Sequence, residues 1–126
     1  MARIVVIDDD PAITHLLRLL LEGDGHDVAV ATDGGRGFAL AQRERPDLVI
    51  LDVMMRVMSG IAVLRSLAND PRTAGVPVVM VSSLDEDDLG GVPTDIEVAA
   101  YVRKPFKATD LLATVSSLTR PAAVAT

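Results

Sequence analysis

Short apolar runs alternate with segments of helical periodicity along most of this 126-residue chain. The runs are rich in β-branched residues, which is typical of strands buried on both faces. Alternation of strands and helices predicts a parallel sheet with right-handed crossovers and helices on both faces. The predicted fold class is therefore α/β, with strands at residues 3–7, 27–31, 48–51, 77–81 and 99–102.

Capping residues and leucine spacing place the helices between these strands. One helix starts after Asp10, where Pro11 suits the first helical position, and a second starts after Asp33. A third follows Gly60, and the last covers about residues 108–118. A further helix is expected near residues 86–89, but two glycines and a proline at 90, 91 and 93 oppose it. That helix is predicted to be short or irregular.

Length and composition indicate one domain, expected at residues 1–120, with a flexible tail at 121–126. The net charge of −6 opposes direct nucleic-acid binding, which requires clustered Lys and Arg. No apolar stretch approaches the roughly 20 residues of a membrane span. Cysteine is absent, which excludes disulfides and thiolate metal sites and favours a cytoplasmic setting.

Polar residues follow four of the five predicted strands. Asp8 and Asp9 follow the first strand, Asp52 the third, Ser82 the fourth and Lys104 the fifth. Parallel strands end at one edge of the sheet, where ligands bind in folds of this class. Carboxylates gathered there would repel one another without a counter-charge. Oxygen ligands without cysteine indicate a hard cation, Mg²⁺ in particular, with Mn²⁺ as an alternative.

These residue types suit phosphoryl transfer to a carboxylate. An aspartate can accept a phosphoryl group as an acyl phosphate. Such transfer depends mainly on positioning and on neutralising the phosphoryl charge. Mg²⁺ and the Lys104 ammonium would neutralise that charge, and the Ser82 hydroxyl could donate a hydrogen bond to a phosphoryl oxygen.

Four segments, in order and over roughly residues 2–118, resemble the signature segments of response-regulator receiver domains of two-component systems: VVIDDDP, VILDVMM, VMVSS and YVRKPF. The resemblance implies a flavodoxin-like, doubly wound sheet with strand order 2-1-3-4-5. It also implies a phosphorylation switch for phosphorelay signalling rather than a metabolic enzyme. It assigns these roles: Asp52 is the phospho-acceptor, Asp8 and Asp9 are the acidic pair that binds Mg²⁺, Met54 contributes a backbone carbonyl ligand, Ser82 and Tyr101 are switch residues, and Lys104 is the essential lysine.

The resemblance also implies partners. A sensor histidine kinase or a phosphotransfer protein would supply the phosphoryl group. An unidentified downstream protein would bind the face formed by the helix near residues 86–89, the strand at 99–102 and the last helix. The chain would be a monomer or a phosphorylation-dependent dimer. Two alternatives stay open: a pseudo-receiver that binds proteins without being phosphorylated, and an aspartate-nucleophile phosphatase. Met54 opposes the latter, since such enzymes usually have a second Asp there.

The chain departs from the family pattern at several places, and two of them bear on function. Arg56 stands where the family usually has Pro, and we expect it to affect phosphodonor access or phosphoryl lifetime. The Gly90–Pro93 stretch falls where the family has its fourth helix, which predicts an altered output surface. His15 and His26 have no partner at metal-binding spacing and are expected at the surface.

Overall fold

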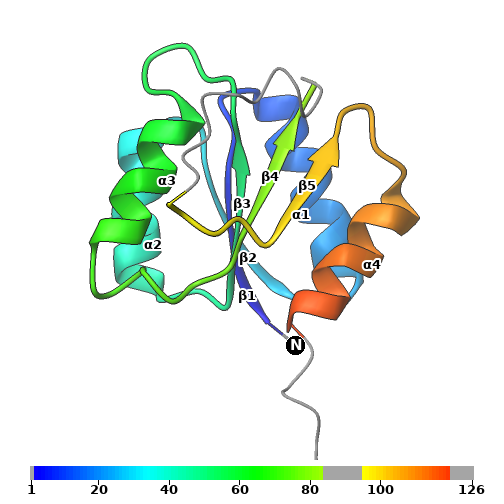
Figure 1. The fold of residues 1–126 in the computed structure, drawn as a ribbon. Coiled ribbons are helices and arrows are strands. Elements are labelled where there is room, and N and C mark those ends of the chain that lie inside the picture. Colours follow the sequence, from blue (N-terminus) through cyan, green and yellow to red (C-terminus); the bar gives the residue numbers. More distant parts are fainter. Residues whose placement is uncertain (1, 84–94, 120–126) are drawn as a thin grey trace, which may run out of the picture.

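The computed structural model describes residues 2–83 and 95–119 (Figure 1). Its strands are β1 (Arg3–Ile7), β2 (Asp27–Ala31), β3 (Leu48–Asp52), β4 (Val78–Ser82) and β5 (Ala100–Arg103). Its helices are α1 (Pro11–Gly23), α2 (Gly34–Glu44), α3 (Gly60–Asn69) and α4 (Ala108–Thr119). The helix expected near residues 86–89 and the tail at 121–126 lie outside the described residues.

The five strands form one parallel sheet in the order β2-β1-β3-β4-β5, which confirms the predicted fold and strand order. Three strands differ from the prediction by one residue: β3 ends one residue later, and β4 and β5 each start and end one residue later. Pro77 has no N–H to donate, although its carbonyl still accepts a 3.0 Å bond from the Val49 N–H. The shift makes Ser82 the last residue of β4 instead of the first residue after it.

The sheet separates two cores, because successive strand residues point to opposite faces. On one face, α2 and α3 cover an apolar cluster that includes Val5, Ile7 and Leu51 (Figure 1). On the other, α1 and α4 cover a cluster that includes Val6 and Ile50. The three central strands β1, β3 and β4 are thus apolar over most of their length, and their polar side chains lie at the strand ends.

Side-chain caps start three helices at the carboxyl end of the sheet. Asp10 accepts a hydrogen bond from the Ala12 N–H at 2.9 Å, which confirms its predicted capping role. Asp33 caps α2 and Ser59 caps α3 in the same way. Each cap satisfies an N–H group that would otherwise have no partner within the helix. The caps fix where the chain turns from the strand ends into the helices.

Replacing Asp33 with Ala is expected to lower the free energy of unfolding by about 1 kcal/mol, the usual contribution of a helix cap. Asp33 Oδ1 accepts a 2.7 Å hydrogen bond from the Arg36 N–H, and Ala cannot replace it. Urea unfolding of the variant measures the loss. Asp33→Asn keeps an accepting oxygen, so its free energy of unfolding should be close to that of wild type. An equal loss of stability in both variants would contradict a capping role.

The surface placement expected for His26 is wrong, whereas His15 is exposed as expected. The His26 side chain is only 8% exposed. Its Nδ1 accepts a 3.1 Å hydrogen bond from the Ala2 N–H, which ties the turn before β2 to the start of β1.

Among the residues that the structure describes, no helix combines the length and apolar character needed to cross a membrane.

Candidate functional site

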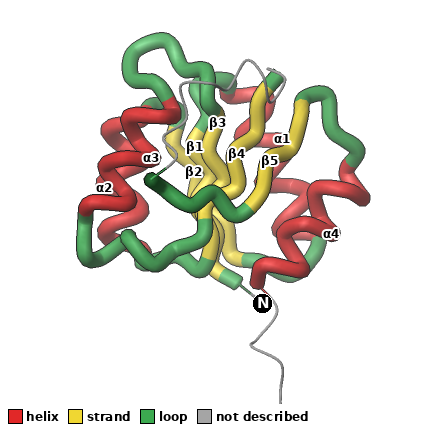
Figure 2. The backbone as a smooth tube through the Cα atoms, in the orientation of Figure 1, coloured by secondary structure: helices red, strands yellow, loops and turns green. Residues whose placement is uncertain are grey.

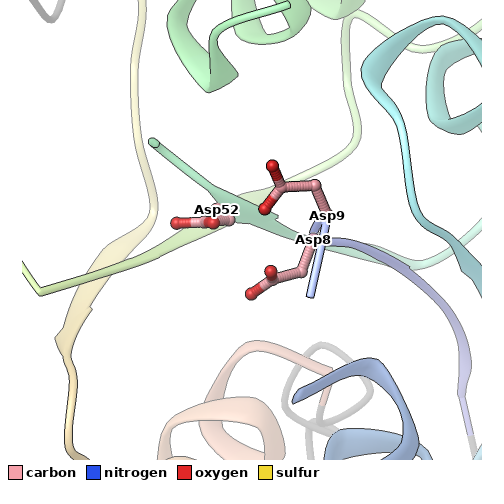
Figure 3. A group of neighbouring side chains, drawn as sticks. All are labelled: Asp8, Asp9 and Asp52. Carbon is pink, nitrogen blue, oxygen red and sulfur yellow. The ribbon is translucent and has the colours of Figure 1, made fainter. Parts of the chain in front are cut away.

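Three carboxylates meet where β1 and β3 end (Figure 3). Asp8 and Asp9 directly follow β1, and Asp52 is the last residue of β3. One oxygen from each lies within 4.8 Å of the other two. Asp8 and Asp52 are 2% and 6% exposed, while Asp9 is partly exposed. The parallel pairing of β1 with β3 therefore brings together residues more than forty positions apart in sequence.

Lys104 supplies a positive charge to this group from the end of β5. Its Nζ donates a 2.8 Å hydrogen bond to Asp8 Oδ2 and lies 3.7 Å from Asp52 Oδ2. The backbone also positions it, because the Lys104 N–H donates a 2.7 Å bond to the Ser82 carbonyl. The ammonium therefore lies between two buried carboxylates and offsets their mutual repulsion.

The environment of Asp52 favours its protonated form. Burial raises the pKa of Asp52 from 3.8 to about 6, with a further contribution from the neighbouring Asp8 charge. Lys104 and the Met54 N–H, which donates to Asp52 Oδ1 at 3.2 Å, act in the opposite direction. A carboxylate in this setting gains from any additional cation, because added positive charge stabilises its ionised form.

Asp9 has a different partner. Its Oδ2 accepts a 2.9 Å hydrogen bond from the Arg56 backbone N–H and lies 3.2 Å from Arg56 Nε. These two hydrogen bonds, backbone first, lower the pKa of Asp9 below its ordinary value. Arg56 belongs to the loop at residues 53–59, which connects β3 to α3 beyond the carboxyl end of the sheet (Figure 2). Asp9 is therefore ionised and already paired in this structure.

Ser82 and Met54 lie at the same end of the sheet, whereas Tyr101 lies two positions before the end of β5. Ser82 is 3% exposed at the end of β4. Tyr101, in β5, is 42% exposed. Met54 is exposed and contributes the N–H bonded to Asp52. The Lys104–Pro105 peptide bond is cis. The structure thus brings together Asp8, Asp9, Asp52 and Lys104, while the predicted role of the Met54 carbonyl stays a prediction.

The donor set fits a hard divalent cation. All three side chains that could act as ligands offer carboxylate oxygens, the atoms that Mg²⁺ prefers. Thiolates are excluded because the chain has no cysteine. A small cation held by few protein ligands keeps coordination positions for water and for phosphoryl oxygens. The site therefore combines a buried carboxylate, a fixed ammonium and an acidic group able to bind metal.

A doubly wound parallel sheet with an acidic cluster and a lysine at its carboxyl edge defines the class of aspartate-centred receiver domains. Residues 4–116 match the family model described as the response regulator receiver domain. The chain belongs to this family, and receiver domains are the signalling switches of two-component systems. This confirms the family inferred from the four sequence segments.

Individual relatives differ in length. The chain is 42% identical to the DNA-binding dual master transcriptional regulator RpaA of Synechocystis sp., over 95% of this chain and 50% of that protein. It is 35% identical to the protein PilH of Pseudomonas aeruginosa, over 94% of this chain and 98% of PilH. The chain thus spans about half of RpaA and nearly all of PilH.

Solved structures show the same fold. The chemotaxis protein CheY4 of Vibrio cholerae superposes with a TM-score of 0.87 at 26% identity, covering 94% of this chain and 98% of that one. The BeF3-activated N-terminal receiver domain of Klebsiella pneumoniae RstA gives a TM-score of 0.83 at 30% identity. The similarity therefore extends over nearly the whole chain.

Sequence reasoning singled out Arg56 but did not find its partner. Asp9 and Arg56 lie 47 positions apart, on different connections of the fold. No local spacing relates them, and each alone is an ordinary charged loop residue. Only the convergence of the loop after β1 with the loop after β3 brings them into contact.

Proposed function

We propose that this chain is a phosphorylation switch in which Asp52 accepts a phosphoryl group from phosphohistidine. The observation that carries the proposal is the setting of the Asp52 carboxylate, which lies 3.7 Å from Lys104 Nζ and within the three-carboxylate cluster. This setting gives one acceptor oxygen and adjacent positive charge, the two requirements of phosphoryl transfer.

The transfer step balances without a further reactant. An Asp52 carboxylate oxygen attacks the phosphorus in line, and an O–P bond forms as the N–P bond to the donor imidazole breaks. The imidazole leaves with the electron pair of that bond and takes up a proton. The product is an acyl phosphate. Water later attacks the phosphorus and releases inorganic phosphate, which returns the Asp52 carboxylate and resets the switch.

Bound at Asp8, Asp9, Asp52 and the Met54 carbonyl, Mg²⁺ would supply charge neutralisation for the phosphoryl oxygens. Lys104 would also neutralise phosphoryl charge, since it already contacts Asp8 and lies near Asp52. Asp8 keeps the ammonium in position through the 2.8 Å hydrogen bond. The protein therefore contributes orientation and fixed charge, and a proton donor is not needed at Asp52.

The signal would leave the site through β4 and β5. Ser82 would move its hydroxyl towards the phosphoryl group, and its carbonyl already accepts the Lys104 N–H at 2.7 Å. Ser82 also pairs in register with Arg103, two positions after Tyr101. A shift of Ser82 can therefore be passed to β5, where the exposed Tyr101 would turn inward and change the populations of the output face.

A sensor histidine kinase or phosphotransfer protein is the proposed phosphodonor. A hollow of about 310 Å³ lies directly beside Lys104, and apolar side chains of α1 and of the segment after β5 line most of it. Leu16 of α1 is 43% exposed at this place. Apolar surface next to a charged centre gives a partner helix a contact area while its phosphohistidine reaches Asp52. The downstream partner is proposed to bind around β5 and α4.

Incubation with acetyl phosphate and Mg²⁺, followed by intact-mass measurement, tests the function. Wild type should gain one phosphoryl group, and Asp52→Asn should gain none, because the amide cannot act as acceptor. Omission of Mg²⁺ should lower the initial labelling rate by at least tenfold, which corresponds to at least about 1.4 kcal/mol of transition-state stabilisation.

Asp47→Asn is the matched control, since Asp47 lies before β3 and its side chain accepts a hydrogen bond from the Arg3 N–H, away from the carboxylate cluster. It should be labelled like wild type. An unlabelled wild type would favour the pseudo-receiver alternative, and undiminished labelling of Asp52→Asn would place the acceptor elsewhere.

A further inference from the structure

Arg56 engages a single oxygen of Asp9 with two donors. The backbone N–H and the side-chain Nε of Arg56 both contact Asp9 Oδ2, at 2.9 and 3.2 Å. Asp9 also belongs to the cluster whose oxygens lie within 4.8 Å of one another. The guanidinium therefore occupies the position of a counter-charge at a residue that the proposed function needs as a metal ligand.

We propose that Arg56 is an intramolecular competitor of Mg²⁺: its side chain pairs with Asp9 in the metal-free protein and must release it for tight metal binding. The inference rests on the proposed function, because it takes Asp9 as a ligand. It concerns Arg56 as a positioning residue, which acts through Asp9 and contacts no reacting atom.

Exposure distinguishes this pair from the ion pair of Lys104 with Asp8. The Arg56 side chain is 85% exposed and Asp9 is 20% exposed, so water can solvate the guanidinium once it leaves. Lys104 and Asp8 are only 21% and 3% exposed, so separating them would leave a buried charge without a partner. Mg²⁺ therefore displaces Arg56 and leaves Lys104 in place.

The loop has room for this change. A hollow of about 310 Å³ beside Asp9 is lined by Arg56 and its loop neighbours, together with Asp33 at the start of α2. The loop is held independently at both ends, by the Met54 N–H on Asp52 and by the 2.9 Å bond from the Gly60 N–H to the Val53 carbonyl. Release of Asp9 thus frees the Arg56 side chain without detaching the loop from β3 or α3.

Isothermal titration of the unphosphorylated protein with Mg²⁺ alone tests the proposal. Arg56→Ala should bind Mg²⁺ about two- to fivefold more tightly than wild type, the range that an exposed ion pair contributes. Arg56→Lys keeps a cation able to pair with Asp9, so its Mg²⁺ affinity should be close to that of wild type. Arg56→Pro also removes the backbone N–H and should bind at least as tightly as Arg56→Ala.

Arg36→Ala is the matched control, because Arg36 is equally exposed, at 84%, and pairs with Asp33. It should leave the Mg²⁺ affinity unchanged. An equal gain in Mg²⁺ affinity in Arg36→Ala would show a general effect of removing a positive charge and would overturn the proposed competition between Arg56 and Mg²⁺. Unchanged or weaker affinity in Arg56→Ala would also overturn it.

A second measurement follows the arginine itself. The Arg56 Nε–Hε resonance of wild type should shift during the Mg²⁺ titration with the dissociation constant found by calorimetry, and a resonance that stays in place would refute displacement. Mg²⁺ binding by wild type without an Arg56 effect defeats this inference alone. Absence of Mg²⁺ binding in wild type and every variant defeats the metal role in the proposed function, and this inference with it.

Discussion

Gly60→Ala is expected to lower the free energy of unfolding by about 3 kcal/mol, the upper part of the usual range for overpacked sites. A Cβ at this position would overlap the Asp52 carbonyl oxygen and lie 2.7 Å from Val53 Cα. Both neighbours are backbone atoms at the end of β3, so rotation of a side chain cannot relieve the clash. α3 must move away, or the end of β3 that carries Asp52 must shift.

Urea unfolding measures this loss, and Gly75→Ala is the matched control. A Cβ at Gly75 would meet no atom within 4 Å. That variant should equal wild type or exceed it by up to about 1 kcal/mol, because Ala restricts the unfolded chain. Within a helix Ala is normally favoured over Gly, so a stabilised Gly60→Ala protein would show that the contact with Asp52 does not constrain α3.

Asp52→Asn is expected to stabilise the metal-free protein by roughly 1–3 kcal/mol at pH 7, following the linkage between pKa and stability. Folding raises the pKa of Asp52 from 3.8 to about 6, first by burial and then through Asp8. The folded protein thus binds this proton more tightly than the unfolded chain. Stability falls as pH rises through the window between these values, and ionised Asp52 destabilises the fold above it. Asn carries no charge and avoids this loss.

Urea unfolding in EDTA at pH 7 and at pH 4 measures the effect. The gain of Asp52→Asn should be full at pH 7 and nearly absent at pH 4, where wild-type Asp52 is protonated in the folded state. Asp27→Asn, at an exposed position of β2, should change stability by less than about 0.5 kcal/mol. A gain that is independent of pH would contradict the electrostatic cause. Mg²⁺ should reverse the order, because it stabilises the protein that retains the ligand.

The sequence predicted the fold well because its signals are local. Strand runs that are apolar on both faces, such as residues 48–51 of β3, identify a sheet covered on both sides. Caps such as Asp10 and Asp33 mark the helix starts directly. The one-residue shift of β4 was missed, because an apolar run does not show which of its residues form hydrogen bonds with the neighbouring strand. His26 was misplaced because nothing near it in sequence shows that the Ala2 N–H is its partner.

The candidate site was predictable in membership, and its internal pairings were not. Residues at the carboxyl ends of parallel strands share one edge, so Asp8, Asp52 and Lys104 could be grouped from strand positions and from the family resemblance. Which carboxylate holds the lysine depends on side-chain geometry within a few ångströms. Lys104 donates to Asp8 at 2.8 Å and stays 3.7 Å from Asp52.

The sequence by itself determined the α/β class, the position of the acidic cluster and its proposed chemistry, because periodicity and motif order can be recognised in the linear sequence. Only the tertiary structure decided how the charges are shared. Burial, a property of the packed state, raises the pKa of Asp52. The convergence of two loops brings Arg56 into hydrogen-bond contact with Asp9. Electrostatic energies depend on distance and solvent exposure, which become defined only when the strands and loops are assembled.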